Sequence, residues 1–284
     1  MAASGFLMEP GGKGLNVAVG LRRLGASVHL LMGVGLDHAG NALQDLLQHE
    51  GLDRRLVHTF DVASGHGAGL IDPSGDHVIV VHPGANHQLT AAHAEAAQAE
   101  IAESKLVYGQ FEVPDAVLEA AFRLGRRAGV RTVLNPSPWR PIDEGLLAHT
   151  DTLLLNEHEA AALFSLEASQ VDDGIAWLGS TQAWRKAHPG IELLITLGAE
   201  GCLSWPAGAD TPHRQASHPV DAVDSTGCGD AFAAAWCFAR ARGDDDASAL
   251  ALATSAGAWL AARPGVIPAL PTLAALQAGA VPHS

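Results

Sequence analysis

Cysteine is scarce in this sequence of 284 residues, with three in total at Cys202, Cys228 and Cys237. They are too few and too scattered for a disulfide framework or a cysteine-ligated zinc site. We therefore expect free thiols and a reducing, cytoplasmic setting. The fifteen histidines form no His-Glu-x-x-His spacing, so the sequence indicates no histidine metal centre either.

Clusters of basic residues are also missing. No run of Lys or Arg exceeds a pair, and the formal net charge is -14. This charge balance argues against nucleic acid or an anionic membrane as the main partner. A phosphate group is still an acceptable ligand, because backbone N–H groups can bind it locally.

Long apolar runs are absent as well. The longest, residues 231–239, is too short to span a bilayer. The first seven residues contain no basic region and no long apolar core, so we expect no signal peptide. The length suits one α/β domain or two small ones, with a sizeable core.

A glycine-rich stretch near the C-terminus is the first feature that suggests chemistry. Gly227, Cys228 and Gly229 precede Asp230 and a run of helix formers, which predicts a loop that opens into a helix. The first N–H groups of such a helix lack internal partners and lie at the positive end of its dipole, so they favour a phosphate. Asp230 can then accept a proton from an attacking hydroxyl. The alternative is an ordinary loop with Asp230 as a helix cap.

A second glycine-rich stretch, residues 11–16, leads into an expected helix at 17–24. No Gly-x4-Gly-Lys-Ser/Thr pattern is present, which excludes a Walker A loop. A dinucleotide fingerprint at residues 33–38 fails, because His38 stands where its third glycine belongs. Two interpretations remain: a corner where a polyhydroxylated ligand contacts backbone, Lys13 and Asn16, or a plain turn with a solvated lysine.

Strand and helix patterns alternate along the second half of the chain. Such alternation predicts a parallel sheet covered on both faces, with ligands at the carboxyl ends of its strands. An earlier hairpin is indicated at 67–71 and 77–81, on either side of an Asp-Pro-Ser-Gly-Asp turn. Strands are expected at 27–32, 106–108, 132–135, 152–155 and 193–196, and helices at 38–50, 90–103, 114–128, 157–164, 177–187, 229–241 and 247–262.

Both glycine-rich stretches resemble signatures of the ribokinase-like (PfkB) carbohydrate kinases. Residues 224–230, Asp-Ser-Thr-Gly-Cys-Gly-Asp, resemble the C-terminal signature. The N-terminal signature is matched in spacing by Gly12, Asn16, Gly25 and Gly35. The signatures occur in the right order, about 200 residues apart, and the resemblance extends to about residue 271. Segments 82–86 and 134–138 resemble the ribokinases most.

The resemblance implies an α/β fold: a ribokinase-like three-layer sandwich with a mostly parallel central sheet and a small β lid. It predicts one kinase domain over residues 1–284, with lid segments at about 1–10 and 59–82. The family places a strand before the first glycine pair, and that strand carries an Asp that binds two sugar hydroxyls. Here ten residues precede Gly11, and Glu9 is the only acid among them.

We therefore expect the first strand and the lid to be incomplete. Three explanations are open. The recorded start lies downstream of the true one, the chain is a truncated and weak kinase, or it is a remnant that binds ligand without turnover.

By the same resemblance, residues from both stretches bind a sugar and ATP. Asp230 is the general base, and the amides of Gly227, Cys228 and Gly229 form an anion hole. Cys228 stands where alanine is usual, and we expect no thiol chemistry from it. The implied sugar-binding residues are Gly12, Lys13, Gly14, Asn16, Glu112 and Asp230, and the implied ATP-binding residues are Asn156, Thr196, Gly198, Gly201, Gly229 and Thr254.

Two cation sites are implied as well. Asn156 and Glu159 match an Asn-x-x-Glu motif that organises Mg²⁺ and phosphate through water, although Glu159 alone also reads as a helix-start carboxylate. Residues 196–201 likewise read as a hairpin turn. A monovalent cation, K⁺ in this family, is implied at Asp224, Thr226, Arg263 and Gly265, but Ala269 replaces a hydroxyl residue common there.

The expected function is ATP-dependent phosphorylation of the primary hydroxyl of a sugar, ribose or a related pentose or hexose. The alternatives are a non-catalytic sugar- or nucleotide-binding protein on the same fold, and a kinase for a nucleoside or a sugar phosphate. The expected lid offers few basic residues, Arg54 and Arg55, that could bind a phosphate, which argues against a sugar phosphate as the substrate. A homodimer through exposed lid edges is a further implication of the family.

Overall fold

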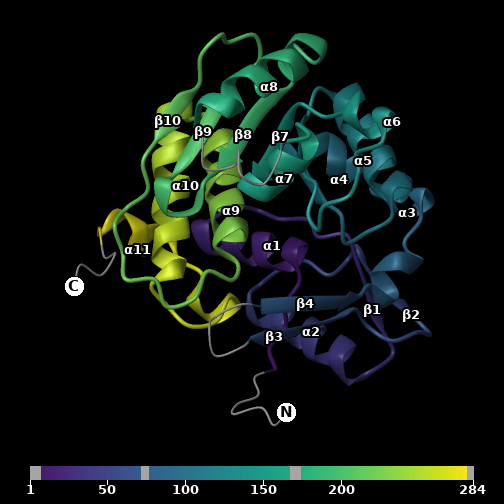
Figure 1. Ribbon diagram of the computed structural model, residues 1–284. Coiled ribbons are helices and arrows are strands. Elements are labelled where there is room, and N and C mark those ends of the chain that lie inside the picture. The colour runs from purple at the N-terminus through teal and green to yellow at the C-terminus, as the bar shows by residue number, and fades with distance from the viewer. Residues whose placement is uncertain (1–7, 72–76, 167–173, 280–284) are drawn as a thin grey trace.

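The computed structural model describes residues 8–71, 77–166 and 174–279. A six-stranded sheet in the order β10-β9-β8-β7-β6-β5 forms its centre (Figure 1). The strands β5 to β8 are parallel, and β9 and β10 are antiparallel additions at one edge. The strands are β5 (Leu106–Gln110), β6 (Arg131–Asn135), β7 (Thr152–Asn156), β8 (Glu192–Thr196), β9 (Cys202–Trp205) and β10 (His213–Gln215).

Helices cover both faces of this sheet, as the alternating pattern predicts. Alternate strand residues supply two separate cores: Leu154 packs with α1, α9 and α10, whereas Leu153 and Leu155 pack with α5, α6 and α7. The first layer contains α1 (Lys13–Leu24), α9 (Cys228–Arg242), α10 (Asp246–Ala261) and α11 (Leu273–Gln277). The second contains α3 (Ala91–Ala96), α4 (Gln98–Glu103), α5 (Asp115–Ala128), α6 (Glu144–Leu147), α7 (Glu157–Leu163) and α8 (Gly174–Ala187).

The remaining described strands form two small sheets of two strands each. β1 (Met32–Gly35) pairs in parallel with β2 (Val57–Phe60), beside α2 (His38–His49). β3 (His66–Ile71) and β4 (His77–His82) form the predicted antiparallel hairpin. Short 3-10 turns lie at Gly84–Gln88, Gly198–Glu200 and Ile267–Ala269.

Strands β1 and β2 form a sheet of their own, separate from the six-stranded sheet, in the part of the chain that the structure describes. Within the described residues, β1 pairs with β2 alone and β5 pairs with β6 alone. The N–H groups on the other side of β1 bond to side chains: Gly33 to Asn86 Oδ1 and Gly35 to Ser64 Oγ, both at 2.9 Å. These bonds satisfy backbone groups that an open strand edge would leave free.

The first expected strand is wrong in position. Residues 27–32 contain only a single bridge, between His29 and Asp53, and the strand begins at Met32. Gly33 and Gly35 are strand residues, and the absence of a Cβ at each admits the backbone of Ala85 and Val62. The helix expected at 90–103 is likewise two helices, interrupted at Ala97.

Three strands, β2, β9 and β10, were not predicted. The turn at 196–201 joins β8 to β9 as a hairpin, with Thr196 opposite Cys202, so the hairpin interpretation of this segment is confirmed. Of the lid segment expected at about 1–10, residues 1–7 lie outside the described residues, and residues 8–10 are not in a strand. No helix in the described part is long and apolar enough to cross a membrane.

Candidate active site

The two glycine-rich stretches meet where α1 packs against α9. A Cβ on Gly20 would lie 2.8 Å from the Ala234 Cβ, so the absence of a side chain lets the two helices approach closely. At their N-terminal ends, Asn16 Nδ2 donates to Asp230 Oδ2 at 2.7 Å. Both residues are buried, at 7% and 5% exposure. The packing therefore brings two predicted site residues into direct contact across 214 positions of the sequence.

Glu112 reaches the same place from the loop after β5. Its Oε2 accepts the Lys13 backbone N–H at 2.8 Å. Gly12 begins the helix at φ 120, and a Cβ there would lie 3.4 Å from Glu112 Oε2. Glycine at this position therefore allows both the backbone conformation and the close approach of the carboxylate.

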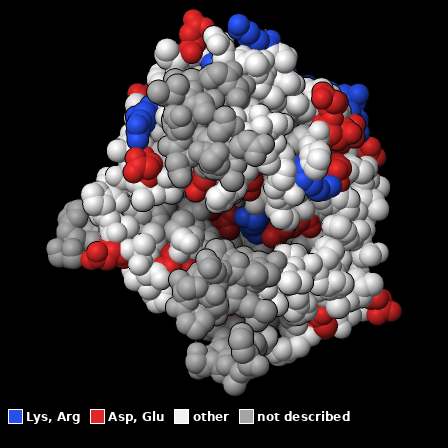
Figure 2. Space-filling view, viewed as in Figure 1, with Lys and Arg blue, Asp and Glu red and all other residues white. Residues whose placement is uncertain are grey.

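Lys13 lies among two buried carboxylates, Asp230 and Glu159, and the half-buried carboxylate of Glu112. Burial raises the pKa of Asp230, Glu112 and Glu159, and the Lys13 ammonium lowers the pKa of each. These opposing effects place Lys13 within electrostatic reach of all three groups. Figure 2 shows a hollow in this face of the molecule in which basic and acidic atoms lie side by side.

Tyr108 and Asn135 form a chain of polar contacts that leads to Glu159. Tyr108 Oη donates to Asn135 Oδ1 at 3.2 Å, and Asn135 Nδ2 lies 3.5 Å from Glu159 Oε2. Burial, and then the charge of Asp230, raise the pKa of Tyr108 well above its usual range, so its hydroxyl stays protonated as a donor. The sequence alone assigns no role to Asn135 or to Tyr108.

Asn156 and Glu159 form the start of α7. Glu159 N–H donates to Asn156 Oδ1 at 2.8 Å, and Asn156 N–H donates to Glu159 Oε2 at 2.9 Å. This is a reciprocal capping box, so the helix-start interpretation of Glu159 is confirmed. The cap also fixes the Glu159 carboxylate near Asn135, at the carboxyl end of the sheet.

The N-terminus of α9 is open on one side. Gly227 has φ 75, and a Cβ there would lie 2.5 Å from Val266 Cγ1, whereas a Cβ on Gly229 would meet nothing within 4 Å. The Cys228 N–H donates to Ser225 O at 3.2 Å, so this amide is already part of the turn. Burial raises the pKa of the Cys228 thiol to about 11, which fits the expectation of no thiol chemistry.

Four further residues expected at the nucleotide fall into two groups. Gly198, at φ 51 with open space beside it, follows Thr196 at the end of β8. Gly201 instead packs its backbone against Gln215, and the Thr254 hydroxyl donates to Leu250 O at 2.9 Å within α10. The first two therefore lie at an accessible strand end, while the contacts of the other two stabilise the fold.

A backbone hydrogen bond links the segments that are expected to hold a monovalent cation. Asp224 N–H donates to Ala261 O at 3.2 Å, and Asp224 Oδ1 accepts from Thr226 N–H at 2.8 Å. The Arg263 guanidinium lies 3.5 Å from the Trp259 ring centroid. A Cβ on Gly265 would lie 3.3 Å from the carboxylate of Glu9. In the part of the chain that the structure describes, no group of three His, Cys, Asp or Glu side chains forms a metal cluster.

Comparison with known proteins decides the family. Residues 1–273 match the profile described as "pfkB family carbohydrate kinase". The chain belongs to this family. It is 33% identical over 267 residues to a ribokinase of Bacillus subtilis, covering 94% of this chain and 86% of that protein. It is 31% identical to a mouse ribokinase, covering 82% of this chain and 72% of the relative.

Solved structures show the same fold. A ribokinase of Arabidopsis thaliana, solved with ribose and ATP, has a TM-score of 0.87 at 24% identity and covers 94% of this chain and 86% of its own. A ribokinase of Thermotoga maritima has a TM-score of 0.82 at 24% identity, covering 98% of this chain and 89% of its own. The ribokinase-like architecture expected from the two signatures is therefore confirmed.

Proposed function

We propose that this carbohydrate kinase transfers the γ-phosphoryl group of ATP to the primary hydroxyl of a sugar, ribose or a related pentose or hexose. The observation that carries the proposal is the buried contact between Asn16 and Asp230, close to Lys13. Relatives named ribokinase, and one from Salmonella typhi named deoxyribokinase at 28% identity, support a pentose. The Arabidopsis structure with ribose and ATP supports the pair of substrates.

An unpaired acceptor supports a hydroxylated ligand at this point. Asn16 Oδ1 is buried and has no hydrogen-bond partner among the described residues. Leaving such a group unpaired costs about 1–3 kcal/mol, so a ligand hydroxyl that donates to it would be favoured. Lys13 and Glu112 add a donor and an acceptor for further hydroxyls. The absent side chains of Gly12 and Gly14 admit Glu112 and Gln110, because a Cβ at these positions would lie 3.4 Å from Glu112 Oε2 and 2.7 Å from Gln110 Nε2.

Asp230 is proposed as the general base. The amide of Asn16 holds its carboxylate, and Lys13 favours the ionised form that can accept a proton. The sugar hydroxyl loses that proton as it attacks the γ-phosphorus, and the bond from phosphorus to the ADP oxygen breaks. A positioned base of this kind contributes about 10²–10⁴-fold to the rate.

The start of α9 is proposed to bind the transferring phosphoryl group. The helix dipole and unpaired N–H groups favour an anion here, and Gly229 leaves open space for one. Gly227 supports the turn, and the Cys228 N–H would be shared between Ser225 O and the anion. Thr196 and Gly198 at the β8 end would border the nucleotide, together with Gly201 and Thr254, the other two residues that the family resemblance implies there.

Mg²⁺ suits the residues at the carboxyl end of the sheet. Glu159 is a buried carboxylate beside Asn135 and Asn156, and Mg²⁺ takes few carboxylates while keeping several waters. When bound, it would neutralise charge on the nucleotide phosphates. For K⁺ the carboxylate of Asp224, the Thr226 hydroxyl and the carbonyls around Gly265 offer suitable oxygens, while the Arg263 side chain is turned onto Trp259.

The free cysteines and an exposed apolar hairpin bear on the proposed cellular compartment and on the proposed homodimer. Cys202, Cys228 and Cys237 are free, which suits the reducing cytoplasm where ATP is available. Val80 and Val81 of β4 are 62% and 48% exposed. These apolar side chains support a homodimer that covers the β3–β4 hairpin.

The deciding experiment measures ADP release from MgATP with ribose, 2-deoxyribose, fructose, ribose 5-phosphate and inosine. Turnover that is fastest with a free sugar supports the proposal. Turnover only with ribose 5-phosphate or inosine would shift the substrate class. Thermal stabilisation by ribose and ATP, with no ADP formed from any acceptor, would overturn catalysis and identify a binding protein.

A further inference from the structure

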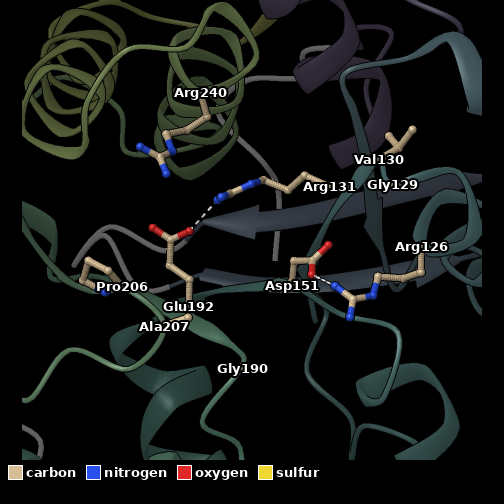
Figure 3. A pocket seen from close by; sticks show the side chains of 10 residues that line it. All are labelled: Arg126, Gly129, Val130, Arg131, Asp151, Gly190, Glu192, Pro206, Ala207 and Arg240. Atoms are coloured by element: carbon tan, nitrogen blue, oxygen red, sulfur yellow. Dashed lines mark hydrogen bonds and ion pairs between the residues drawn. The ribbon is translucent and has the colours of Figure 1, made fainter.

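A cavity of about 330 Å³ lies at the ends of the strands opposite the candidate active site. Its wall includes the starts of β6 and β8 and the last turn of α9 (Figure 3). Strand β6 runs from Arg131 in this wall to Asn135 at the active site, a separation of roughly 13 Å at 3.3 Å per residue. The cavity is therefore separate from the proposed kinase site.

Glu192 supplies an unsatisfied acceptor in this wall. The residue is 4% exposed, and its Oε2 accepts from Arg131 Nη1 at 2.7 Å and Thr152 Oγ1 at 3.1 Å. Its Oε1 is buried and has no partner among the described residues. A buried oxygen of this kind favours a ligand that brings a hydrogen-bond donor.

Arg240 supplies positive charge beside it. Figure 3 shows its guanidinium extending from α9 toward the ion pair of Arg131 and Glu192. The other lining carboxylate, Asp151, pairs with Arg126, and no carboxylate of the described residues lies within ion-pair distance of Arg240. Arg240 Nη1 donates to Asp244 O at 3.2 Å, which leaves further guanidinium N–H groups available.

The net charge of the wall is unusual for this chain. Three arginines and two carboxylates line the cavity, whereas the whole chain carries a net charge of -14. A guanidinium without a carboxylate partner fits the planar, bidentate geometry of a carboxylate or phosphate. The volume lies at the lower end of the range for ligand sites, which favours a small molecule.

We propose that this cavity is a second ligand site for a small hydroxylated anion. The carboxylate or phosphate of the ligand binds Arg240, and a hydroxyl of the ligand donates to Glu192 Oε1, entering between the two side chains. Arg131 and Thr152 hold the Glu192 carboxylate in place. The proposal concerns binding alone and does not depend on the kinase reaction.

Calorimetric titration with four probes tests the proposal. Glycerate and glycerol 3-phosphate carry both an anion and hydroxyls, and they separate carboxylate from phosphate; inorganic phosphate and glycerol carry one feature each. We expect glycerate, glycerol 3-phosphate or both to bind, each more tightly than the single-feature probes. Arg240→Met should weaken that binding at least tenfold, while Arg214→Met, a matched surface change at a paired arginine, leaves it unchanged.

Glu192→Gln provides the second variant, and it should reduce the affinity of the hydroxylated anions toward that of inorganic phosphate. Should either variant fail to fold, phenylglyoxal labelling of the unmodified chain gives the same information. Bound glycerate or glycerol 3-phosphate should slow modification of Arg240, mapped by peptide mass, and leave Arg214 unaffected. Equal Arg240 labelling with and without probe, or equal affinity of Arg240→Met and the parent chain, would overturn the proposal.

Discussion

The Asn16 side chain donates to Asp230 across the junction of α1 and α9, at 2.7 Å between Nδ2 and Oδ2. This bond holds one carboxylate oxygen of Asp230 in a site that is almost closed to water. As the proposed base, Asp230 held in this way would lose little freedom when a substrate hydroxyl arrives. The pair thus links the N-terminal and C-terminal motifs of the family in one geometry.

Replacing the proposed base tests its role directly. We expect Asp230→Asn to lower kcat about 10²–10⁴-fold, because the amide cannot accept the hydroxyl proton. ATP binding should change little, since asparagine keeps the volume and can still pair with Asn16. Steady-state ADP release and calorimetric ATP titration measure the two effects. Asp221→Asn on the exposed surface is the matched control, and kcat within a few-fold of the parent in Asp230→Asn would refute the assignment.

Lys13 should set the acid limb of the pH profile. Burial raises the pKa of Asp230, and Lys13 and Asn16 lower it. Removing the ammonium in Lys13→Met therefore raises that pKa further, so the base is protonated at a higher pH and activity is lost at a higher pH. The kcat profile measured from pH 5 to 9 should show the acid limb displaced upward in Lys13→Met and near its original position in Lys13→Arg. An acid limb at the same pH in Lys13→Met and in the parent would show that Lys13 does not influence the pKa of Asp230.

Glu159 should set the Mg²⁺ requirement. Glu159→Gln keeps the capping box, because glutamine can also accept the Asn156 N–H, but it removes the charge that would orient metal-bound water. Changes of this kind weaken metal affinity about 10–100-fold. We expect the free Mg²⁺ concentration for half-maximal activity to rise by that factor, with the thermal midpoint almost unchanged. Glu157→Gln, on the same helix turn, is the control; an equal Mg²⁺ requirement in both variants would contradict the role of Glu159.

The elements that hold the site could be predicted because their signals are local. The α9 start follows from glycine before a helix-forming run, and the parallel pairing of β5 to β8 follows from their alternation with helices. The start of α1 was wrong: the helix begins at Lys13, four residues before the expected start at 17, so Lys13 and Asn16 lie in its first turn. Asp230 and Asn16 were assigned from their motifs, and the structure brings them together. Their roles in catalysis stay predictions until the variants are measured.

The features that could not be predicted from the sequence depend on contacts between residues far apart in the chain. Gly33 and Gly35 look like turn residues in isolation, but their role is to admit the backbone of residues that follow much later in the chain. Tyr108 reaches Asn135 only because β5 and β6 are neighbours with Gly109 opposite Leu134. The reciprocal cap of Glu159 also shows that one carboxylate can stabilise a helix start and still lie at the proposed metal position.

The crossing of α1 and α9 should be sensitive to a single methyl group. A Cβ on Gly20 would lie 2.8 Å from the Ala234 Cβ, so Gly20→Ala forces the helices apart and should cost about 1–3 kcal/mol of the free energy of unfolding.

The control is Gly257→Ala in α10, where the new Cβ would have ordinary contacts, 3.6 Å from Cys228 O and 4.0 Å from Phe232 Cβ. Gly257→Ala should raise the free energy of unfolding by about 0.5–1 kcal/mol, because alanine restricts the unfolded chain more than glycine does. Urea unfolding compares the two variants. Gly20→Ala should also lower kcat, because separating the helices lengthens the bond between Asn16 and Asp230; stabilisation of both variants would show that α1 and α9 can adjust without strain.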